Sequence, residues 1–303
     1  MKMKTLFVLA AFAAGCGGTQ SSNPASDSAT AEDPPILGIA YTRDETAKRD
    51  QFRRRSSANM TYHGGKILQS NVTQTIFWGP SWNNSSFAGD KITGLDSWYG
   101  GFGGSGYAGT TTEYTQSGGA HVGTSSTFQG HHIDLSTASG GGQSSAILAE
   151  VCKVITNPDP SGNGYYAVYT DLPRGNAGYC AWHSSGTCGS TPVQFAFFWN
   201  LDGDPGCDPQ DTTTGHSQGL AALANVSGHE LAEAMTDPAN PGAWYDSRGS
   251  ENGDKCAWTF NVPSVTFTNG THWKIQGEWS NNAFNARTGY PNSSGQKGCL
   301  DGH

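Results

Sequence analysis

Charged side chains are scarce in this chain of 303 residues, where aspartate, glutamate, lysine and arginine together make up 14%. The 17 lysines and arginines are outnumbered by 25 aspartates and glutamates, which leaves a formal net charge of −8 at pH 7. A protein that binds the phosphate backbone of a nucleic acid needs the opposite balance of charge. The composition therefore argues against a nucleic acid as a partner.

Long apolar runs are also missing: after residue 16, none approaches the roughly 20 residues that a bilayer-spanning helix needs. One shorter run, at 5–14, follows Lys2 and Lys4 and leads into A-A-G-C at 13–16. A basic start, a short apolar segment and a small-residue cleavage site before a cysteine are typical of bacterial lipoprotein signals. We expect removal of residues 1–15 and lipidation of Cys16 in the cell envelope, at the outer membrane, with ordinary secretion as the alternative. The lipid would be the protein's attachment to a membrane.

Cysteines are few, and with Cys16 set apart they form an even set of six: Cys152, Cys180, Cys188, Cys207, Cys256 and Cys299. An even number of cysteines in an exported protein indicates disulfides. We predict that Cys256 pairs with Cys299 and that the other four form two further bridges. The connectivity of those four does not follow from the sequence.

The segment 16–57 has the composition of a connector rather than of a core. Residues 17–35 are rich in serine, threonine, alanine, aspartate and proline, as in a flexible tether. Residues 42–57 are dense in charge and contain R-R-R at 53–55. We interpret them as a solvated linker, with a pro-segment cut at the basic run as the alternative. A single domain is then expected over residues 58–303, with ordered structure beginning at Tyr62.

Hydrophobic periodicity predicts both strands and helices in this domain. The expected strands are 66–68, 72–78, 165–170, 193–199, 264–267 and 272–275, and the expected helices are 87–99, 143–155 and a longer one ending near 237. The glycine-rich stretch 100–142 suits either a binding loop or short strands, and His183 falls in a cysteine-bearing loop. Strands before and after a central helix predict an α+β domain with a mixed β-sheet, stapled by disulfides. We expect it to be a monomer.

The longer helix contains the run 228–238, G-H-E-L-A-E-A-M-T-D-P. It begins like the zinc-peptidase motif H-E-x-x-H, but Glu233 replaces the second histidine. Four residues apart on a helix, His229 and Glu233 project from one face and can hold one metal ion, with Glu230 placed as general base. A leucine stripe lies on the opposite side, and Ser217 or Thr214 can cap the start of the helix. The alternative is a His–Glu pair on a wet surface without metal.

Further acidic residues follow, in W-Y-D at 244–246 and E-N-G-D-K-C at 251–256. Together with Y-H-G-G at 62–65 and Y-C-A-W-H-S at 179–184, these segments resemble the phosphate-induced protein family, also called Exordium-like. Its bacterial members resemble metallopeptidases and carry H-E-L-A-E-A-x-T-D-P followed by W-Y-D and E-x-x-D-x-C. The resemblance covers about residues 62–299. It implies a zincin-like zinc peptidase acting on a peptide or protein substrate.

A catalytic zinc ion needs a third protein ligand, and the sequence leaves its identity open. Glu251 stands eighteen residues after Glu233, close to the interval at which thermolysin-like enzymes place a glutamate ligand. Asp254 would then contact the ligands and hold them in position, without binding the ion itself. Asp237 is the rival, because the helix break at Pro238 could turn it back towards the ion. The further candidates are Asp246 and His183.

One imidazole and two carboxylates suit zinc, but they are harder ligands than the usual set, so manganese and calcium stay as alternatives. A bound zinc ion would polarise the peptide carbonyl and acidify its water, with Glu230 as the base. Tyr245 could donate to the developing oxyanion or simply pack in the core.

A second hypothesis is a non-catalytic cell-surface binding or signalling module. Plant members of the family often lack H-E-x-x-E, so the fold can be kept without the metal site. Several aromatic residues could stack on sugars in such a module: Trp78, Trp82, Trp98 and Tyr99.

Overall fold

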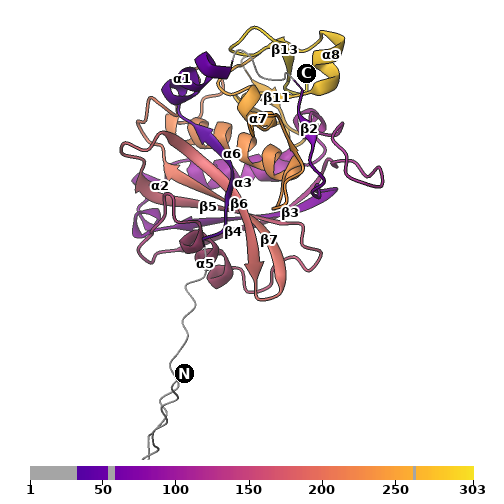
Figure 1. Cartoon of the computed structure of the whole chain (residues 1–303). Helices are drawn as coiled ribbons and strands as arrows, with labels where there is room; N and C mark the ends of the chain where they lie inside the picture. Colours follow the sequence, from indigo (N-terminus) through magenta and orange to yellow (C-terminus); the bar gives the residue numbers. More distant parts are fainter. Residues whose placement is uncertain (1–32, 54–58, 262–263) are drawn as a thin grey trace, which may run out of the picture. The chain divides into compact units, whose positions relative to one another are not determined.

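A mixed six-stranded β-sheet lies at the centre of the protein, for which a computed structural model describes residues 33–53, 59–261 and 264–303 (Figure 1). The strand order is β1-β6-β7-β5-β3-β4. Strands β7, β5, β3 and β4 are parallel, whereas β6 is antiparallel to β7 and β1 is antiparallel to β6. The strands of this sheet are β1 (Ile36–Tyr41), β3 (Ser70–Trp78), β4 (Ser125–Asp134), β5 (Gly164–Pro173), β6 (Tyr179–Cys188) and β7 (Thr191–Asn200).

Both faces of the sheet are covered, because strands such as β5 and β7 carry apolar side chains on both faces. Phe77, Tyr169 and Phe198 belong to an apolar cluster with helices α3 (Lys91–Phe102) and α6 (Gln218–Thr236). Their neighbours Ile76, Val168 and Phe197 face the other way, towards helix α5 (Ser144–Val154). The result is an α+β domain with a mixed sheet.

Shorter elements surround this centre. They are α1 (Arg43–Arg53), β2 (Thr61–Tyr62), η1 (Pro80–Asn83), α2 (Ser85–Ala88), α4 (Gly106–Gly109), β8 (Trp244–Tyr245), α7 (Asn252–Lys255), β9 (Val265–Thr266), β10 (His272–Trp273), β11 (Glu278–Trp279), α8 (Asn281–Ala286), β12 (Tyr290–Pro291) and β13 (Lys297–Leu300). Strands β11, β13 and β12 form a small C-terminal sheet. The predicted strand at 66–68 is wrong, since these residues lie outside any strand.

Helix α6 begins and ends where its sequence indicates. The Ser217 hydroxyl caps it by accepting a hydrogen bond from the Leu220 amide, and the helix ends at Thr236, with Asp237 as its C-cap before Pro238. The alternative of a His–Glu pair on a wet helix surface is wrong, because every residue from 219 to 236 is buried. The side of α6 that carries the histidine and the glutamates is therefore enclosed by other elements rather than facing water.

Residues 36–53 correct the predicted tether, and with it the expected start of order at Tyr62. They form β1, at the edge of the central sheet, and α1. Ala40 in β1 is only 3% exposed. The segment I-L-G-I-A-Y is a short apolar run beside charged residues. Its strand conformation depends on pairing with β6, which lies about 140 residues later in the chain.

Three disulfides cross-link the domain: Cys152–Cys188, Cys180–Cys207 and Cys256–Cys299. The predicted pairing of Cys256 with Cys299 is confirmed, and Cys16 lies outside the described residues. Disulfides fit an oxidising compartment outside the cytoplasm. Across the described ranges, no helix has the length and apolar character needed to cross a bilayer.

The aromatic residues proposed as a sugar platform are in the interior. Trp82 and Trp98 are buried, as are Trp78 and Tyr99. Trp82 packs against Phe77, and its indole N–H donates to the carbonyl oxygen of Tyr169. These four side chains fill the core instead of presenting stacking surfaces, so this support for carbohydrate binding is lost.

Candidate metal site

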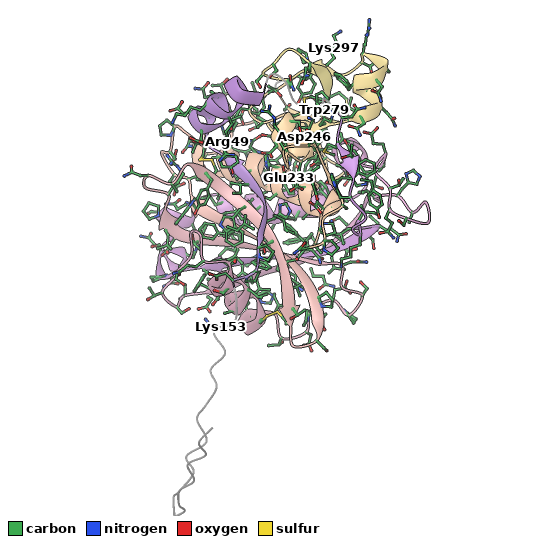
Figure 2. The ribbon with its side chains drawn as sticks, viewed as in Figure 1. Arg49, Lys153, Glu233, Asp246, Trp279 and Lys297 are labelled. Carbon is green, nitrogen blue, oxygen red and sulfur yellow. A yellow bond between two sulfur atoms is a disulfide. The ribbon has the colours of Figure 1, made fainter. Side chains whose placement is uncertain are left out.

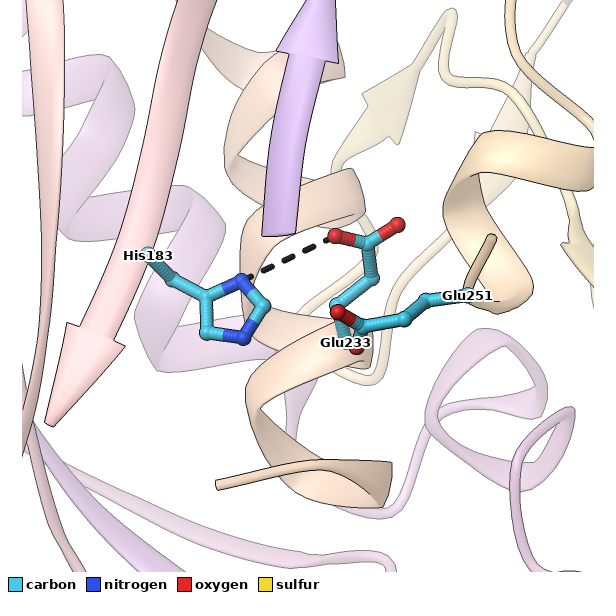
Figure 3. A group of neighbouring side chains, drawn as sticks. All are labelled: His183, Glu233 and Glu251. Carbon is cyan, nitrogen blue, oxygen red and sulfur yellow. Dashed lines mark ion pairs between the residues drawn. The ribbon is translucent and has the colours of Figure 1, made fainter. Parts of the chain in front are cut away.

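Three elements bring an imidazole and three carboxylates together beneath the sheet. Strand β6 supplies His183, helix α6 supplies Glu230 and Glu233, and the residue before α7 supplies Glu251. All four side chains are buried. Ligand-type atoms of His183, Glu233 and Glu251 lie within 4.8 Å of one another, as Figure 3 shows. This spacing allows one cation to contact all three.

Two carboxylate oxygens in this group of side chains make no hydrogen bond. Oε2 of Glu233 and Oε2 of Glu251 are buried and make no hydrogen bond. A buried polar atom without a partner costs the folded state free energy, more so when it is charged. Figure 2 shows the contrast between Glu233, inside the molecule, and Lys297, at its surface. A cation among these atoms would remove the deficit.

The electrostatics also favour a cation. Burial and the nearby charge of Glu233 raise the pKa of Glu251 well above its usual value. Burial likewise raises the pKa of Glu230, although His183 opposes the shift. For Glu233, burial acts in the same direction, but His229 and His183 outweigh it and lower the pKa. The carboxylates therefore repel one another in a site that excludes water, and positive charge stabilises them.

His183 is oriented as a metal ligand would be. Its Nε2 lies 3.4 Å from the carbonyl oxygen of Asp237, which can only accept a hydrogen bond. With the proton on Nε2, Nδ1 presents a lone pair 3.2 Å from Glu230 Oε2 and 3.7 Å from Glu233 Oε2. A lone pair facing two carboxylate oxygens requires a proton or a metal ion between them. Metal-bound histidines commonly donate their other N–H to a backbone carbonyl in this way.

His229, the first residue of the motif, has different surroundings. Its Nε2 lies 3.0 Å from Glu233 Oε1, and its Nδ1 lies 3.1 Å from Nε2 of Gln276. The Gln276 amide is oriented by its own partners, because its oxygen accepts from the Trp258 N–H and its nitrogen donates to the Gly253 carbonyl. An amide N–H therefore faces Nδ1, which must accept it. Burial opposes protonation, but the charge of Glu233 outweighs it and raises the pKa of His229 to about 10, so Nε2 carries a proton that faces Glu233 instead of a metal.

A second cluster, His229, Glu233 and Asp254, also has ligand-type atoms within 4.8 Å of one another. It shares Glu233 with the first cluster, and the Asp254 N–H donates to Glu233 Oε1 at 3.0 Å. The tautomer of His229 makes this cluster the weaker of the two. Its members surround Glu233 and hold its carboxylate in place.

Asp237 and Asp246 belong to neither cluster. The Asp237 carboxylate accepts a hydrogen bond from the Ala243 N–H, and burial raises its pKa to about 6. Asp237 contacts His183 through its carbonyl oxygen. Asp246 pairs with Lys255 at 3.2 Å. Of the two leading candidates for the third ligand, Glu251 lies close to Glu233 and His183. The Asp237 carboxylate instead accepts a hydrogen bond from the backbone N–H of Ala243.

A cavity of about 230 Å³ opens beside the cluster. It is lined by Ile36, Leu37, Asp237, Asn240, Gly242, Tyr245, Gly249 and Glu251. The Tyr245 ring stacks on His63 with 3.7 Å between ring centroids, so Tyr245 forms a wall of this cavity rather than part of the core. Glu251 connects the cavity to the three-residue cluster.

The G-x-S-x-G pattern at 215–219, which in some hydrolases carries a nucleophilic serine, has a structural role here. Its serine, Ser217, caps α6, and its hydroxyl bonds to Asp90. Within the described residues, no histidine is among the hydrogen-bond partners of Ser217. This pattern therefore supplies no catalytic triad.

The predicted loop around His183 is wrong, and with a loop in that place the residue is only a minor ligand candidate. Residues 179–188 form β6 instead, and the alternation of that strand directs His183 towards α6. The signal available in the sequence was the strand-like run Y-C-A-W-H-S.

Comparison of the chain with protein-family models, with curated proteins and with solved structures finds no match.

Proposed function

We propose that this protein is an exported metal-dependent peptidase in which His183, Glu233 and Glu251 hold one cation. The observation that carries the proposal is the buried cluster itself, in which an imidazole and two carboxylates converge and two carboxylate oxygens make no hydrogen bond. One nitrogen and several oxygen donors suit zinc first, with manganese and calcium as the alternatives.

The proposed chemistry assigns the base to Glu230. A bound zinc ion would polarise the scissile carbonyl and lower the pKa of water. Glu230 Oε2 lies 3.2 Å from His183 Nδ1, next to the ligands. It would take one proton from the attacking water while oxygen bonds to the carbonyl carbon. The C–N bond then breaks, and Glu230 returns the proton to the leaving amine, so the net reaction adds one water.

A zincin-like fold and membership of the Exordium-like family are parts of the same proposal. Their support is a buried helix that carries H-E-x-x-E beneath a mixed sheet, together with the downstream Glu251. His183 departs from the motif-based expectation, because the ligand set would draw its histidine from β6 instead of from α6.

The test begins with metal content. Purified protein should retain about one equivalent of zinc after dialysis, and it should cleave an unfolded protein in a chelator-sensitive reaction. Glu230→Gln keeps the size of the side chain but removes the base, so the variant should retain metal and lose roughly a hundredfold or more in rate. A metal-loaded Glu230→Gln protein with full peptidase activity would contradict the assignment.

The full burial of the cluster favours one other candidate, a binding module in which the cation has only a structural role. That protein would bind metal and lose stability on chelation, but it would cleave nothing. Glu230→Gln would then leave its function unchanged. The presence or absence of cleavage in the metal-loaded protein separates the two proposals.

A further inference from the structure

Strand β1 lies directly over the candidate site. Gly38 is paired with His183 in the sheet. A Cβ atom at Gly38 would lie 2.1 Å from Glu233 Oε2 and 2.4 Å from Cε1 of His183. Figure 3 shows the ribbon of β1 passing beside Glu233. The backbone of β1 therefore occupies the space next to these two residues, and a side chain at position 38 would require Glu233, His183 or β1 itself to move.

The same strand also engages the proposed base. The Ala40 N–H donates to Glu230 Oε1 at 2.9 Å, in a fully buried hydrogen bond. The other oxygen of Glu230 contacts His183. While β1 is in place, the Ala40 amide therefore takes up an acceptor site of Glu230 that an attacking water would use. Departure of β1 would release Oε1 at the moment when the site becomes accessible.

The attachment of β1 permits such a departure. It is the edge strand, and its pairing with β6 is irregular at two places, between Ile36 and Gly38 and between Ala40 and Tyr41. None of the three disulfides includes a residue of the described segment 33–53. Its other ties are non-covalent, including a hydrogen bond from the Trp258 indole to the Tyr41 carbonyl. Removing β1 breaks no cross-link.

The neighbouring cavity continues the space that β1 fills. Ile36 and Leu37 form one wall, and Glu251 connects the cavity to the cluster. An extended chain lying along β6 would thus pass the cluster and place side chains in this cavity. Pairing of this kind uses main-chain hydrogen bonds for affinity and pockets for alternate side chains for specificity.

We propose that the groove between β6 and α6 binds an extended peptide in antiparallel pairing with β6, and that β1 occupies this groove as a displaceable strand of the same chain. The inference rests on the proposed peptidase function and names its substrate class. The peptide should carry glycine at the position opposite His183. The full burial of the cluster is then the closed state of the enzyme.

The main test is Gly38→Ala in the full-length, zinc-loaded protein. The added Cβ should displace β1, so that amides of residues 36–41 exchange with solvent roughly tenfold faster and zinc is released faster to a chelator. Cleavage of an unfolded protein should rise by a similar factor, because more of the protein is open. Gly100→Ala is the matched control, since a Cβ at Gly100 meets no atom within 4 Å.

A second variant should weaken the packing of β1 without changing or contacting the proposed metal ligands. Ile39 packs partly buried on the opposite face of the sheet, in the apolar cluster that includes Val154 of α5. Ile39→Ala should increase exchange at β1 and cleavage, whereas Val154→Ala should destabilise the same apolar cluster without either effect. If Gly38→Ala does not fold, the comparison of these two variants tests whether β1 is displaceable.

The experiments distinguish a failure of the proposed function from a failure of the inference about β1. If the wild-type protein binds no metal, the proposed function fails. If metal is bound and Ile39→Ala changes neither exchange at β1 nor cleavage, β1 is a permanent wall and the inference about the groove is overturned.

Discussion

Two histidines contact Glu233, and their different surroundings indicate different roles. His183 donates from Nε2 to a carbonyl and directs Nδ1 at carboxylates, while His229 must accept an N–H at Nδ1. The same residue type can therefore be a ligand or a positioning group, depending on what lies behind the ring. Motif spacing reports only which face of a helix a residue occupies.

The ligand assignment predicts an order of effects. His183→Ala should abolish stoichiometric zinc binding, because it removes a direct donor. His229→Ala should weaken zinc affinity by roughly tenfold, as expected for a group that holds a ligand in place. Elemental analysis after dialysis and a competition titration measure both. The reverse order would assign the ion to the cluster of His229, Glu233 and Asp254.

Glu150, on α5, provides a residue-level test away from the metal site. Burial and Asp134 raise its pKa to about 6, with Lys153 opposing. A raised pKa means that the folded state favours the protonated acid, so stability falls as pH rises from about 4.5 through 6. Glu150→Gln should therefore be more stable than wild type by about 1 kcal/mol at pH 7.5, after discounting for solvent screening. Below pH 4.5 the difference should vanish.

Thermal melting at both pH values measures the effect. Lys153 keeps Asp134 as a partner in the variant, so the loss of one ion pair is partly offset. Equal stability of variant and wild type across the range would contradict the prediction.

At the level of elements, the position of Glu251 depends on a very short helix. Glu251 is the residue that precedes α7, and Cys256 follows the end of this single turn. The disulfide to Cys299 joins Cys256 to β13 in the C-terminal sheet. A turn this short has little stability of its own, so the cross-link restricts the segment that carries the proposed ligand.

Replacing both Cys256 and Cys299 by alanine should lower the free energy of unfolding by about 2–4 kcal/mol. Zinc affinity should fall as well, because the Glu251 segment loses a restraint. The control removes Cys152 and Cys188, a bridge of similar span at α5 and β6. It should reduce stability by a comparable amount and leave zinc affinity nearly unchanged. Denaturant unfolding and zinc titration of both double variants would expose equal effects on affinity, which would rule out this role.

For the whole molecule, the disulfides and the N-terminal sequence indicate the same environment. Three bridges fit an oxidising compartment, and A-A-G-C at 13–16 resembles a lipoprotein processing site. A lipid at Cys16 would tether the domain to a membrane surface. Its substrates would then be extracytoplasmic peptides or proteins.

Lipidation is directly measurable. Intact-mass analysis of protein from a bacterial envelope fraction should show a mature chain that begins at Cys16 with a diacyl or triacyl adduct. Cys16→Ser should shift the protein out of the membrane fraction. Unmodified mature protein that begins at another residue would show ordinary secretion instead.

The sequence by itself determined the features that local chemistry controls. Periodicity, the Ser217 cap and Pro238 located α6, and short apolar runs rich in aromatic residues located β5 and β7, because each signal acts within a few residues. An even cysteine set indicated disulfides. Interval and residue type also made Glu251 the leading third ligand, and the structure places it beside Glu233.

Tertiary structure alone decided what depends on residues far apart in the chain. Strand β1 exists through pairing with β6, and His183 faces Glu230 from a position 47 residues earlier. The Ala243 N–H donates a hydrogen bond to the Asp237 carboxylate. The tryptophans that were candidates for stacking on sugars are buried in the core. Such contacts leave little local signal, because packing and long-range hydrogen bonds, not local propensity, stabilise them.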